Sequence, residues 1–465
     1  MPRGTAAAQG SIVGEALSKG SGIHGRFGYG ILLQGSAAGA FQRAFVSTTV
    51  APQSSASIAP QEPDCLAKMG VRPMLLYELA CKIIYLNGEI SLLDVANHLR
   101  TSLAVAQEIF WFLRREQLCE VTGMVGNVHR LICSAKGRER AQQLLEINHY
   151  TGAAPVSLEA YMSQVQAQAA ISKDVKPADL ERVFTDLVLE PDVLPKLGAA
   201  VQSGRAIFLY GPTGTGKTSV AEKLGELFSE HHVWVPHAIE VDGDILSVYD
   251  PVVHKSLGAP SALVDRRWEL CRRPKVVVGG ELTLDMLDLG FNAATRFYSV
   301  PAQMKANNGV LIIDDFGRQR VRPSELLDRW VVPLDRKIDF LTLKSGKKIE
   351  VPFDVMVIFA TNRNPAEVVE PAFLRRIQTK IKLDPVTREA FHEIFRRVCV
   401  ENQLQYQSSV VDSVIAALEQ AGEPLRPCYP RDLINQVCWA AKYESQTPHL
   451  DIPSLQRALS AYFLA

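Results

Sequence analysis

The chain has 465 residues, of which 47 % are hydrophobic and 22 % are charged, a composition typical of a soluble protein with about two or three domains. Lysine plus arginine and aspartate plus glutamate both number 50, so the net charge does not indicate a nucleic-acid or acidic-membrane binder. No apolar run approaches the ~20 residues that cross a bilayer, which argues against membrane insertion. The eight cysteines form no C-x-x-C pair, which favours free thiols in a reducing cytoplasm over disulfides or a zinc site.

Residues 1–62 differ from the rest of the chain in composition, because alanine, glycine and serine dominate and Glu15 is the only acid before Glu62. An arginine-bearing, serine-rich, acid-poor leader resembles an organelle transit peptide. A disordered tail or a misassigned start codon is the favoured interpretation. The basic residues of this segment are Arg3, Lys19, Arg26 and Arg43.

Residues 63–150 carry helix and strand patterns in an order typical of a winged helix. Apolar residues recur at helical spacing, and serines or threonines stand where helix N-caps are expected. We therefore predict a small α+β winged-helix-like domain here. Its predicted elements are a helix from Met74 to Leu86, a helix after the N-cap Ser91, a helix from Leu103 to Gln117 after Thr101 or Ser102, strands at Leu118–Val121 and Val128–Ile132, and a helix opening at Ser134.

The third predicted helix bears on whether this domain binds duplex DNA or docks a protein. Its Arg114 and Arg115 are offset by Glu108 and Glu116, and residues 110–112 add more apolar surface than a groove reader needs. Protein docking is therefore favoured, with duplex DNA as the alternative partner. A modest basic patch keeps that alternative open: His129, Arg130, Lys136, Arg138 and Arg140.

A glycine-rich segment in the middle of the chain fits G-x-x-x-x-G-K-[ST], the P-loop pattern. An apolar run, Ile207 to Tyr210, precedes it, and a helical run follows from Ser219, as the motif requires. The glycines let backbone N–H groups cradle phosphates, while Lys217 would reach the β- and γ-phosphates and Thr218 would bind Mg²⁺. The predicted nucleotide-binding residues are Gly211, Pro212, Thr213, Gly214, Thr215, Gly216, Lys217 and Thr218.

Two carboxylates end an apolar run from Val310 to Ile313, which is a Walker B pattern. The carboxyl end of a buried parallel strand places Asp314 beside the P-loop, where it could hold Mg²⁺. Asp315 follows where a catalytic base or water-positioning carboxylate is needed. We therefore predict Thr218 and Asp314 as metal ligands and Asp315 as catalytic.

Three further segments bear on the chemistry. A second apolar strand, 355–360, ends near Asn362, whose amide could orient water beside the γ-phosphate. Arg375 and Arg376 follow a short apolar helix and could serve a neighbouring subunit as an arginine finger. Arg431 begins a helix just after Pro430 and would point back at nucleotide.

In this order and at these intervals the chain resembles the AAA+ ATPase superfamily over roughly residues 187–465. The matching features are Walker A, Walker B, a sensor-1 Asn362, the Arg375–Arg376 pair and a sensor-2 Arg431. The resemblance implies ATP and Mg²⁺ as cofactors, ATP hydrolysis, and a ring homo-oligomer, usually a hexamer. It also implies an α/β nucleotide-binding domain with a parallel sheet flanked by helices (187–387) and a helical lid (388–465), with 151–186 as a linker and adaptor helix.

Two details indicate a branch of the superfamily. Residues 337–351 alternate and turn at Ser345–Gly346, as a β-hairpin does. This looks like the pre-sensor-1 hairpin of MoxR-like chaperones, enhancer-dependent activators and RuvB-type motors, as does the run 303–310. About 70 residues separate the P-loop helix from Walker B, too many for one strand–helix unit, which predicts an insert within 243–300 that includes a strand or hairpin at Val276–Gly280. Candidate pore aromatics are Tyr249, Phe291, Phe297 and Tyr298, each more typical of a core.

The chain departs from the family at Asp315, where a glutamate is usual. Aspartate is shorter by one methylene, so its carboxylate retreats by ~1.5 Å, enough to slow a reaction at a positioned water. We expect active but modest turnover.

Three functions follow from these features. The leading hypothesis is a chaperone-like ATPase that remodels an unknown protein client recruited by the winged helix. A DNA-directed ATPase is the first alternative, since Lys344, Lys347 and Lys348 lie at the hairpin tip. A nucleotide-gated scaffold with little turnover is the second, motivated by Asp315.

Overall fold

The computed structural model describes residues 59–169, 175–228, 231–258 and 264–463. The predicted leader, residues 1–62, lies outside these ranges except for its last four residues. Within the described residues, no helix is both long and apolar enough to cross a membrane.

Residues 66–147 form four α-helices and a three-stranded antiparallel sheet of order β1-β3-β2. Three predicted helix starts are confirmed, because the hydroxyls of Ser91, Ser102 and Ser134 accept the N–H of Asp94, Val105 and Gly137. The first hairpin strand runs further than expected, to Val125 rather than Val121, and the second ends one residue later, at Cys133. The elements are η2 (Leu66–Met69), α1 (Pro73–Asn87), β1 (Ile90–Ser91), α2 (Leu92–Leu99), α3 (Leu103–Arg115), β2 (Cys119–Val125), β3 (Val128–Cys133) and α4 (Ala135–Ile147).

The segment predicted as a linker contributes to packed structure. Strand β4 (Val156–Ser157) pairs in parallel with β7 (Ala238–Val241). Helix α5 (Leu158–Ala169) follows, and its Tyr161 and Val165 belong to the core of that neighbouring region. Helix α6 (Pro177–Val183) is the last element of the predicted linker.

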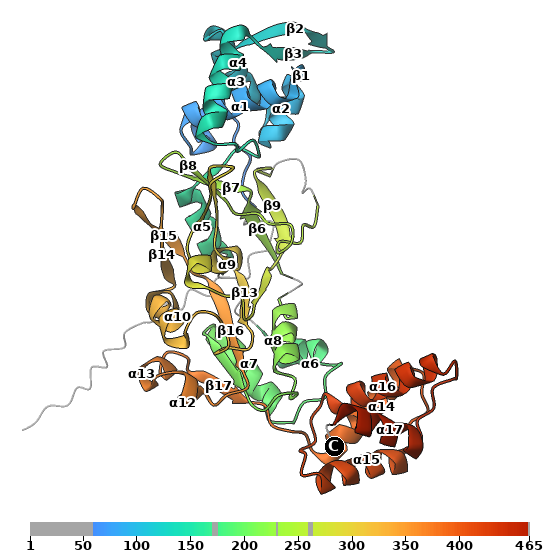
Figure 1. The fold of residues 1–465 in the computed structure, drawn as a ribbon. Helices are drawn as coiled ribbons and strands as arrows, with labels where there is room; N and C mark the ends of the chain where they lie inside the picture. Colours follow the sequence, from blue (N-terminus) through green and yellow to red (C-terminus); the bar gives the residue numbers. More distant parts are fainter. Residues whose placement is uncertain (1–58, 170–174, 229–230, 259–263, 464–465) are drawn as a thin grey trace, which may run out of the picture. The chain divides into compact units, whose positions relative to one another are not determined.

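A five-stranded parallel sheet of order β10-β13-β16-β5-β17 forms the centre of the α/β region, as the sequence predicts (Figure 1). The central strands β13, β16 and β5 are apolar runs that are covered on both faces. Phe208, Leu311 and Phe359 face one core, whereas Leu209, Ile312 and Ile358 face the other, the alternation of a strand. The elements are α7 (Val193–Ser203), β5 (Ile207–Tyr210), α8 (Lys217–Glu226), β10 (Lys275–Val278), β13 (Gly309–Ile313), β16 (Val355–Thr361) and β17 (Thr379–Lys382).

The insert is larger than predicted and begins earlier, at β6. The assignment of Val276–Gly280 to this insert is wrong, because Lys275–Val278 pairs with β13 as an edge strand of the central sheet. A run of three valines suits a strand of the insert and a strand of the central sheet equally well. Only its pairing with β13 shows that it belongs to the central sheet. The insert sheets have the orders β11-β12-β8-β7-β4 and β6-β9. The elements are β6 (His232–Pro236), β7, β8 (Asp244–Ser247), β9 (Trp268–Arg272), η4 (Leu284–Leu287), β11 (Gly290–Asn292), β12 (Phe297–Ser299) and α9 (Ala302–Lys305).

The predicted hairpin is confirmed between the Walker B strand and β16. Its two strands pair antiparallel from Ile338–Pro352 to Thr342–Lys348, and Gly346 takes the left-handed conformation of the turn, with φ 84°. The elements here are α10 (Pro323–Arg329), α11 (Val331–Arg336), β14 (Ile338–Thr342), β15 (Lys348–Pro352), α12 (Pro365–Val368) and α13 (Pro371–Leu374).

The chain ends in four helices with their own apolar core, in which Phe391, Phe395 and Leu433 are fully buried. Thr387 caps the first helix by accepting the N–H of Ala390. These helices are α14 (Arg388–Glu401), α15 (Ser408–Gln420), α16 (Tyr429–Tyr443) and α17 (Ile452–Tyr462).

Candidate functional site

The P-loop connects β5 to α8 and depends on glycine at three positions. Gly211, Gly214 and Gly216 have φ values of 145°, 80° and 84°, which favour glycine strongly. A Cβ at position 211 would lie 2.1 Å from the carbonyl oxygen of Leu383. The glycines therefore let the loop lie close to β17 and turn into the N-terminus of α8, where backbone N–H groups suit an anion.

Lys217 lies within the loop rather than in solvent. Its Nζ donates to the carbonyl oxygens of Gly211, at 3.0 Å, and Pro212, at 2.7 Å. Burial lowers the pKa of this ammonium group, while the carboxylates of Asp314 and Asp315 oppose that shift. The carbonyl oxygens of the loop thus hold the Lys217 cation beside the backbone N–H groups of the same loop, which suit phosphate oxygens.

Thr218 and Asp314 meet although 96 residues separate them in sequence. The Thr218 hydroxyl donates to the Asp314 carboxylate, 2.9 Å from its Oδ2. Gln319 supports the turn after β13 by donating to the Asp314 carbonyl oxygen at 2.7 Å. A hydroxyl and a carboxylate are oxygen donors of the kind that Mg²⁺ takes when phosphates and waters complete its shell, so this pair fits that ion.

Asp315 is the second residue after β13 and is exposed. Its φ of 49° is left-handed, a conformation that aspartate tolerates better than most side chains. Its own N–H donates to Asp314 Oδ1 at 3.0 Å. The carboxylate therefore lies in the same cavity as Lys217 and Thr218 and is not held in an ion pair among the described residues.

The end of β16 brings a third polar group to this edge. Asn362 Nδ2 lies 3.5 Å from Thr213 Oγ1 of the P-loop. The preceding Thr361 donates to the carbonyl oxygen of Phe316 at 2.7 Å, which ties the end of β16 to the turn after β13. The carboxyl ends of β5, β13 and β16 thus present their polar residues together.

A cavity of about 470 Å³ joins this edge to the C-terminal helices, a volume suited to a small-molecule ligand. It brings together Lys217, Thr218, Asp314, Asp315 and Asn362, the residues predicted around the phosphates and metal. From α16, Arg431 also lines it and forms an ion pair with Glu401 at 3.3 Å.

The apolar part of this cavity's wall was not predicted from the sequence. A half-buried apolar run, Leu187–Leu189, lies opposite Ile394 and Val398 of α14. Such side chains could cover a planar base. The sequence signal was present as an apolar triplet before α7 and an i, i+4 pair on α14, but nothing in it placed the two together. Arg318 and Cys428 also line the cavity.

The packing of the C-terminal helices against the P-loop is close. A Cβ at Gly214 would lie 2.6 Å from Cys428 Sγ, which precedes α16. A side chain at position 214 would therefore push the helices away from the loop.

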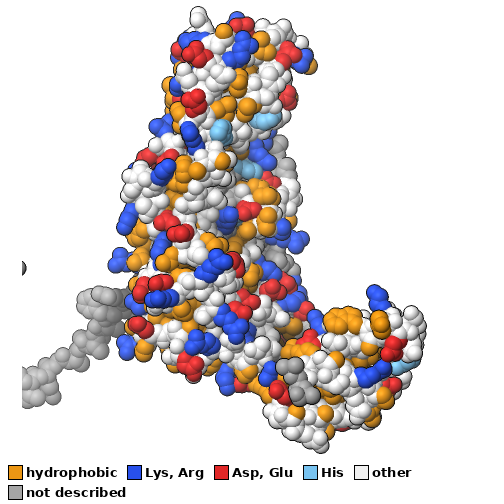
Figure 2. Space-filling view, viewed as in Figure 1, with side chains coloured by type: hydrophobic (Ala, Val, Ile, Leu, Met, Phe, Trp, Pro, Cys, Tyr) orange, Lys and Arg blue, Asp and Glu red, His pale blue; other side chains and the backbone are white. Residues whose placement is uncertain are grey.

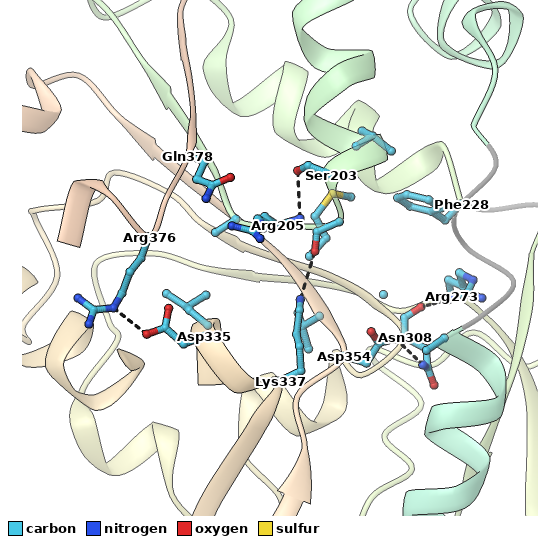
Figure 3. A pocket seen from close by; sticks show the side chains of 18 of the residues that line it. Ser203, Arg205, Phe228, Arg273, Asn308, Asp335, Lys337, Asp354, Arg376 and Gln378 are labelled. Atoms are coloured by element: carbon cyan, nitrogen blue, oxygen red, sulfur yellow. Dashed lines mark hydrogen bonds and ion pairs between the residues drawn. The ribbon is translucent and has the colours of Figure 1, made fainter. Parts of the chain in front are cut away.

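The two arginines predicted as a finger do not lie in this cavity. Arg375 and Arg376 line a separate cavity of about 930 Å³ beside Arg205 and the first residues of β13 and β16 (Figure 3). Arg376 Nε donates to Asp335 at 2.9 Å, and its guanidinium lies 5.4 Å from the centre of the Phe373 ring. Strands β13 and β16 span five and seven residues, so about 15 Å or more separates the two edges of the sheet.

The candidate pore aromatics pack within the protein. Tyr298 is buried in the insert core, where its hydroxyl accepts the N–H of Lys344. Tyr249 and Phe291 pack partly buried against the same core, and Phe297 packs against the core of residues 66–154.

Comparisons with known proteins assign no function to the chain. A family model described as a domain of unknown function (DUF8689) matches residues 387–461, which contain the four C-terminal helices. No curated protein matches the chain.

Similar solved structures include NtrX from Brucella abortus in complex with ADP, with 14 % identity and a TM-score of 0.36, over 68 % of this chain and 64 % of that one. The chain thus spans less than two thirds of that NtrX structure. A RuvB mutant from Thermotoga maritima matches with 15 % identity and a TM-score of 0.34, over 58 % of this chain and 69 % of its own. Domain III of the Thermotoga maritima replication initiation protein DnaA matches with 15 % identity and a TM-score of 0.35, over 61 % and 98 %. All three TM-scores lie below 0.5, so function rests on the site itself.

Proposed function

We propose that this chain is an AAA+ ATPase that binds ATP with Mg²⁺, hydrolyses it, and works as a ring homo-oligomer, most simply a hexamer. The observation that carries the proposal is the single cavity that joins Lys217, Thr218, Asp314, Asp315 and Asn362 to the helical lid. Kinases and GTPases share a P-loop, but the combination of Asn362, an arginine pair and a lid arginine is not required by either.

The proposed roles follow from position. The loop amides and Lys217 would bind and orient the phosphates, and Thr218 with Asp314 would hold Mg²⁺, which neutralises phosphate charge. Asp315 would accept a proton from, or orient, the attacking water, and Asn362 would fix that water's position. Arg431 would couple the position of the lid to the presence of bound nucleotide, because it lies on α16 and lines the same cavity.

Completion of the site by a neighbour is supported by the position of Arg375 and Arg376. They lie at the amino-terminal edge of the sheet, while the nucleotide cavity lies at the other edge. An arginine that stabilises transferring phosphate must touch it, so these residues would act on the next subunit in a ring.

We further propose that residues 63–150 are a winged-helix module that recruits a protein client for remodelling. The order of helices and strands in this part of the chain supports the module. Trp111 on α3 is 57 % exposed, with the Arg114 guanidinium 5.6 Å from its ring centre. Exposed tryptophan beside arginine is the composition of a protein-binding hot spot. In the same division of the chain, 187–387 binds nucleotide and 388–465 is the lid.

A DNA-directed ATPase remains the rival function, but two hairpin lysines are engaged within the chain. Lys347 forms an ion pair with Asp242, and Lys344 Nζ lies 4.6 Å from the ring centre of Phe291. On the face seen in Figure 2, basic and acidic side chains intermingle over the described residues, unlike a DNA-binding stripe. Stimulation of hydrolysis by duplex DNA, lost at higher salt, would favour this rival over protein remodelling.

The test of the ATPase proposal is hydrolysis per subunit as a function of protein concentration. A rate that climbs as subunits assemble supports completion by a neighbour. Mixing a Lys217→Ala chain with an Arg375→Ala, Arg376→Ala chain should then restore activity that each lacks alone. At some interfaces of the mixed ring, the first chain supplies intact arginines to the intact nucleotide cavity of the second. A flat rate near zero with ATP still bound would replace the motor with the nucleotide-gated scaffold that Asp315 motivates.

A further inference from the structure

The cavity at the amino-terminal edge of the central sheet is a candidate ligand site distinct from the P-loop. Its volume is about 930 Å³, within the range of small-molecule and cofactor sites. The first residues of β13 and β16 and the residues just before β5 and β17 line it, and the end of α7 and the segment after α11 border it. Figure 3 shows side chains from these separate segments converging on one space.

The lining of this cavity carries more positive than negative charge. Among the described residues, five cationic side chains and two carboxylates line it, so cations outnumber carboxylates by three in this part of the wall. Arginine dominates the cations, and its planar guanidinium matches the oxygens of a phosphate group in paired hydrogen bonds. The charged lining residues are Arg205, Arg273, Lys337, Arg375, Arg376, Asp335 and Asp354.

Arg273 is the most deeply buried of these cations, with 7 % of its surface exposed. One of its terminal nitrogens, Nη2, donates to the carbonyl oxygen of Gln168 at 3.1 Å, and Nη1 donates to that of Asn308. Its Nε has no hydrogen-bond partner among the residues that the structure describes. Burial lowers the pKa of this guanidinium to about 10, so it stays charged at neutral pH. A buried charged donor without a partner is costly, and an anion in the cavity would satisfy it.

Two more guanidinium groups at this cavity are held less firmly. The Arg205 and Arg375 side chains make no hydrogen bond or ion pair within the described residues, and both are exposed. By contrast, Arg376 is paired with Asp335 and Lys337 donates to the Gly204 carbonyl oxygen at 3.2 Å. Arg205 is therefore available for a ligand of this cavity at little cost in existing contacts, whereas Arg375 is left for the neighbouring subunit in the proposed ring.

Apolar side chains complete the wall. Phe228 follows α8, and Met356 lies in β16; both are more than nine-tenths buried but reach the cavity. They would suit a ring or another apolar group beside the charged part of a ligand. The other apolar lining side chains are Ala169, Val201, Ala206, Leu334, Val355 and Ala372.

We propose that this cavity binds a phosphate ester of nucleotide size, with Arg205 and Arg273 contacting the phosphate groups and the Phe228–Met356 wall contacting its apolar part. The site is separate from the P-loop and does not depend on hydrolysis, so it stands or falls independently of the proposed ATPase activity. Free phosphate compounds and nucleotides share the recognised chemistry, and the experiment below distinguishes them.

The experiment measures binding to the full-length Lys217→Ala chain, in which the P-loop is disabled. Equilibrium dialysis with labelled pyrophosphate and, separately, labelled ADP should show one site per chain. Arg205→Gln in the same background should weaken binding at least about tenfold, because a charge-assisted contact is lost. Arg205→Lys should keep part of it. Arg396→Gln, which removes an exposed arginine of α14, is the matched control for net charge and should change little.

Each outcome is decisive. Pyrophosphate bound as tightly as ADP identifies the phosphate groups as the ligand's essential part, and tighter ADP binding identifies a nucleotide. No binding of either probe overturns the proposal, as does equal weakening by Arg205→Gln and Arg396→Gln. Thermal melts establish that the variants are folded. Arg273→Lys keeps the buried charge but removes Nε, and it should weaken binding in a chain that still melts cooperatively.

Discussion

The two edges of the central parallel sheet both suit anions, but they are built differently. At the carboxyl-terminal edge, loop amides, the N-terminus of α8 and one buried lysine face a cavity that residues of the C-terminal helices also line. At the amino-terminal edge, long side chains, mostly of arginine, supply the positive charge.

Because of this difference, the first edge can be recognised from the sequence and the second can be recognised from the folded chain alone. A backbone cradle needs glycines in a fixed sequence pattern, so it leaves a motif. A side-chain cluster needs only that strand starts and helix ends from distant segments meet, so it leaves none. The α7 end, the β5 start and the segment after α13 come together only in the folded chain.

The largest expected effect separates the two edges in ATP binding. Lys217→Ala removes the buried cation of the P-loop and should weaken ATP binding by about a hundredfold or more. Arg205→Gln removes a cation at the opposite edge and should leave ATP binding at the P-loop unchanged. Calorimetric titration of both variants measures this. Comparable losses in the two variants would mean that the edges are not independent.

A smaller effect is expected at Asp315. Asp315→Glu extends the carboxylate toward the position that a positioned water would take, and kcat should rise by roughly three- to tenfold. The left-handed backbone at this residue limits the gain, because glutamate tolerates that conformation less well than aspartate. Steady-state hydrolysis at saturating ATP measures it. A fall in kcat would show that the pocket is built for aspartate.

The smallest expected effect is a pH dependence at Lys217. Burial lowers the pKa of its ammonium group, and phosphate binding requires the charged form. As pH rises through that lowered pKa, the free protein loses the proton that the complex retains, so affinity falls.

ATP affinity should thus decrease over the alkaline interval in which pH rises toward the usual lysine pKa of about 10.4, and binding titrations at a series of pH values measure that loss. The Lys217→Arg variant stays charged over that interval and should lose this dependence even if it binds more weakly. A wild-type affinity that is flat with pH would argue against a titrating lysine at the phosphates.

Much of the fold was predictable because its signals are local. Ser91, Ser102 and Ser134 mark helix starts through their own side chains. The β14–β15 hairpin follows from alternation around Gly346. The apolar runs of β13 and β16 indicate strands buried on both faces.

The partners of some strands were not predictable. Lys275–Val278 is an edge strand of the central sheet rather than part of the insert, and β4 in the predicted linker joins an insert sheet. Short apolar runs fit several sheets equally well. Which sheet they join depends on contacts with residues far away in sequence.

By itself, the sequence determined the P-loop, the two carboxylates after β13 and the polar residue after β16, because chemistry at strand ends requires fixed residues at fixed short spacing. Tertiary structure alone decided which of the candidate residues share a cavity. It placed Arg431 with the P-loop residues and Arg375 and Arg376 at the opposite edge of the sheet. The physical reason is that parallel strands bring all their carboxyl ends to one edge of the sheet and all their amino ends to the other. A local sequence motif does not specify which of these two edges the following segment will reach.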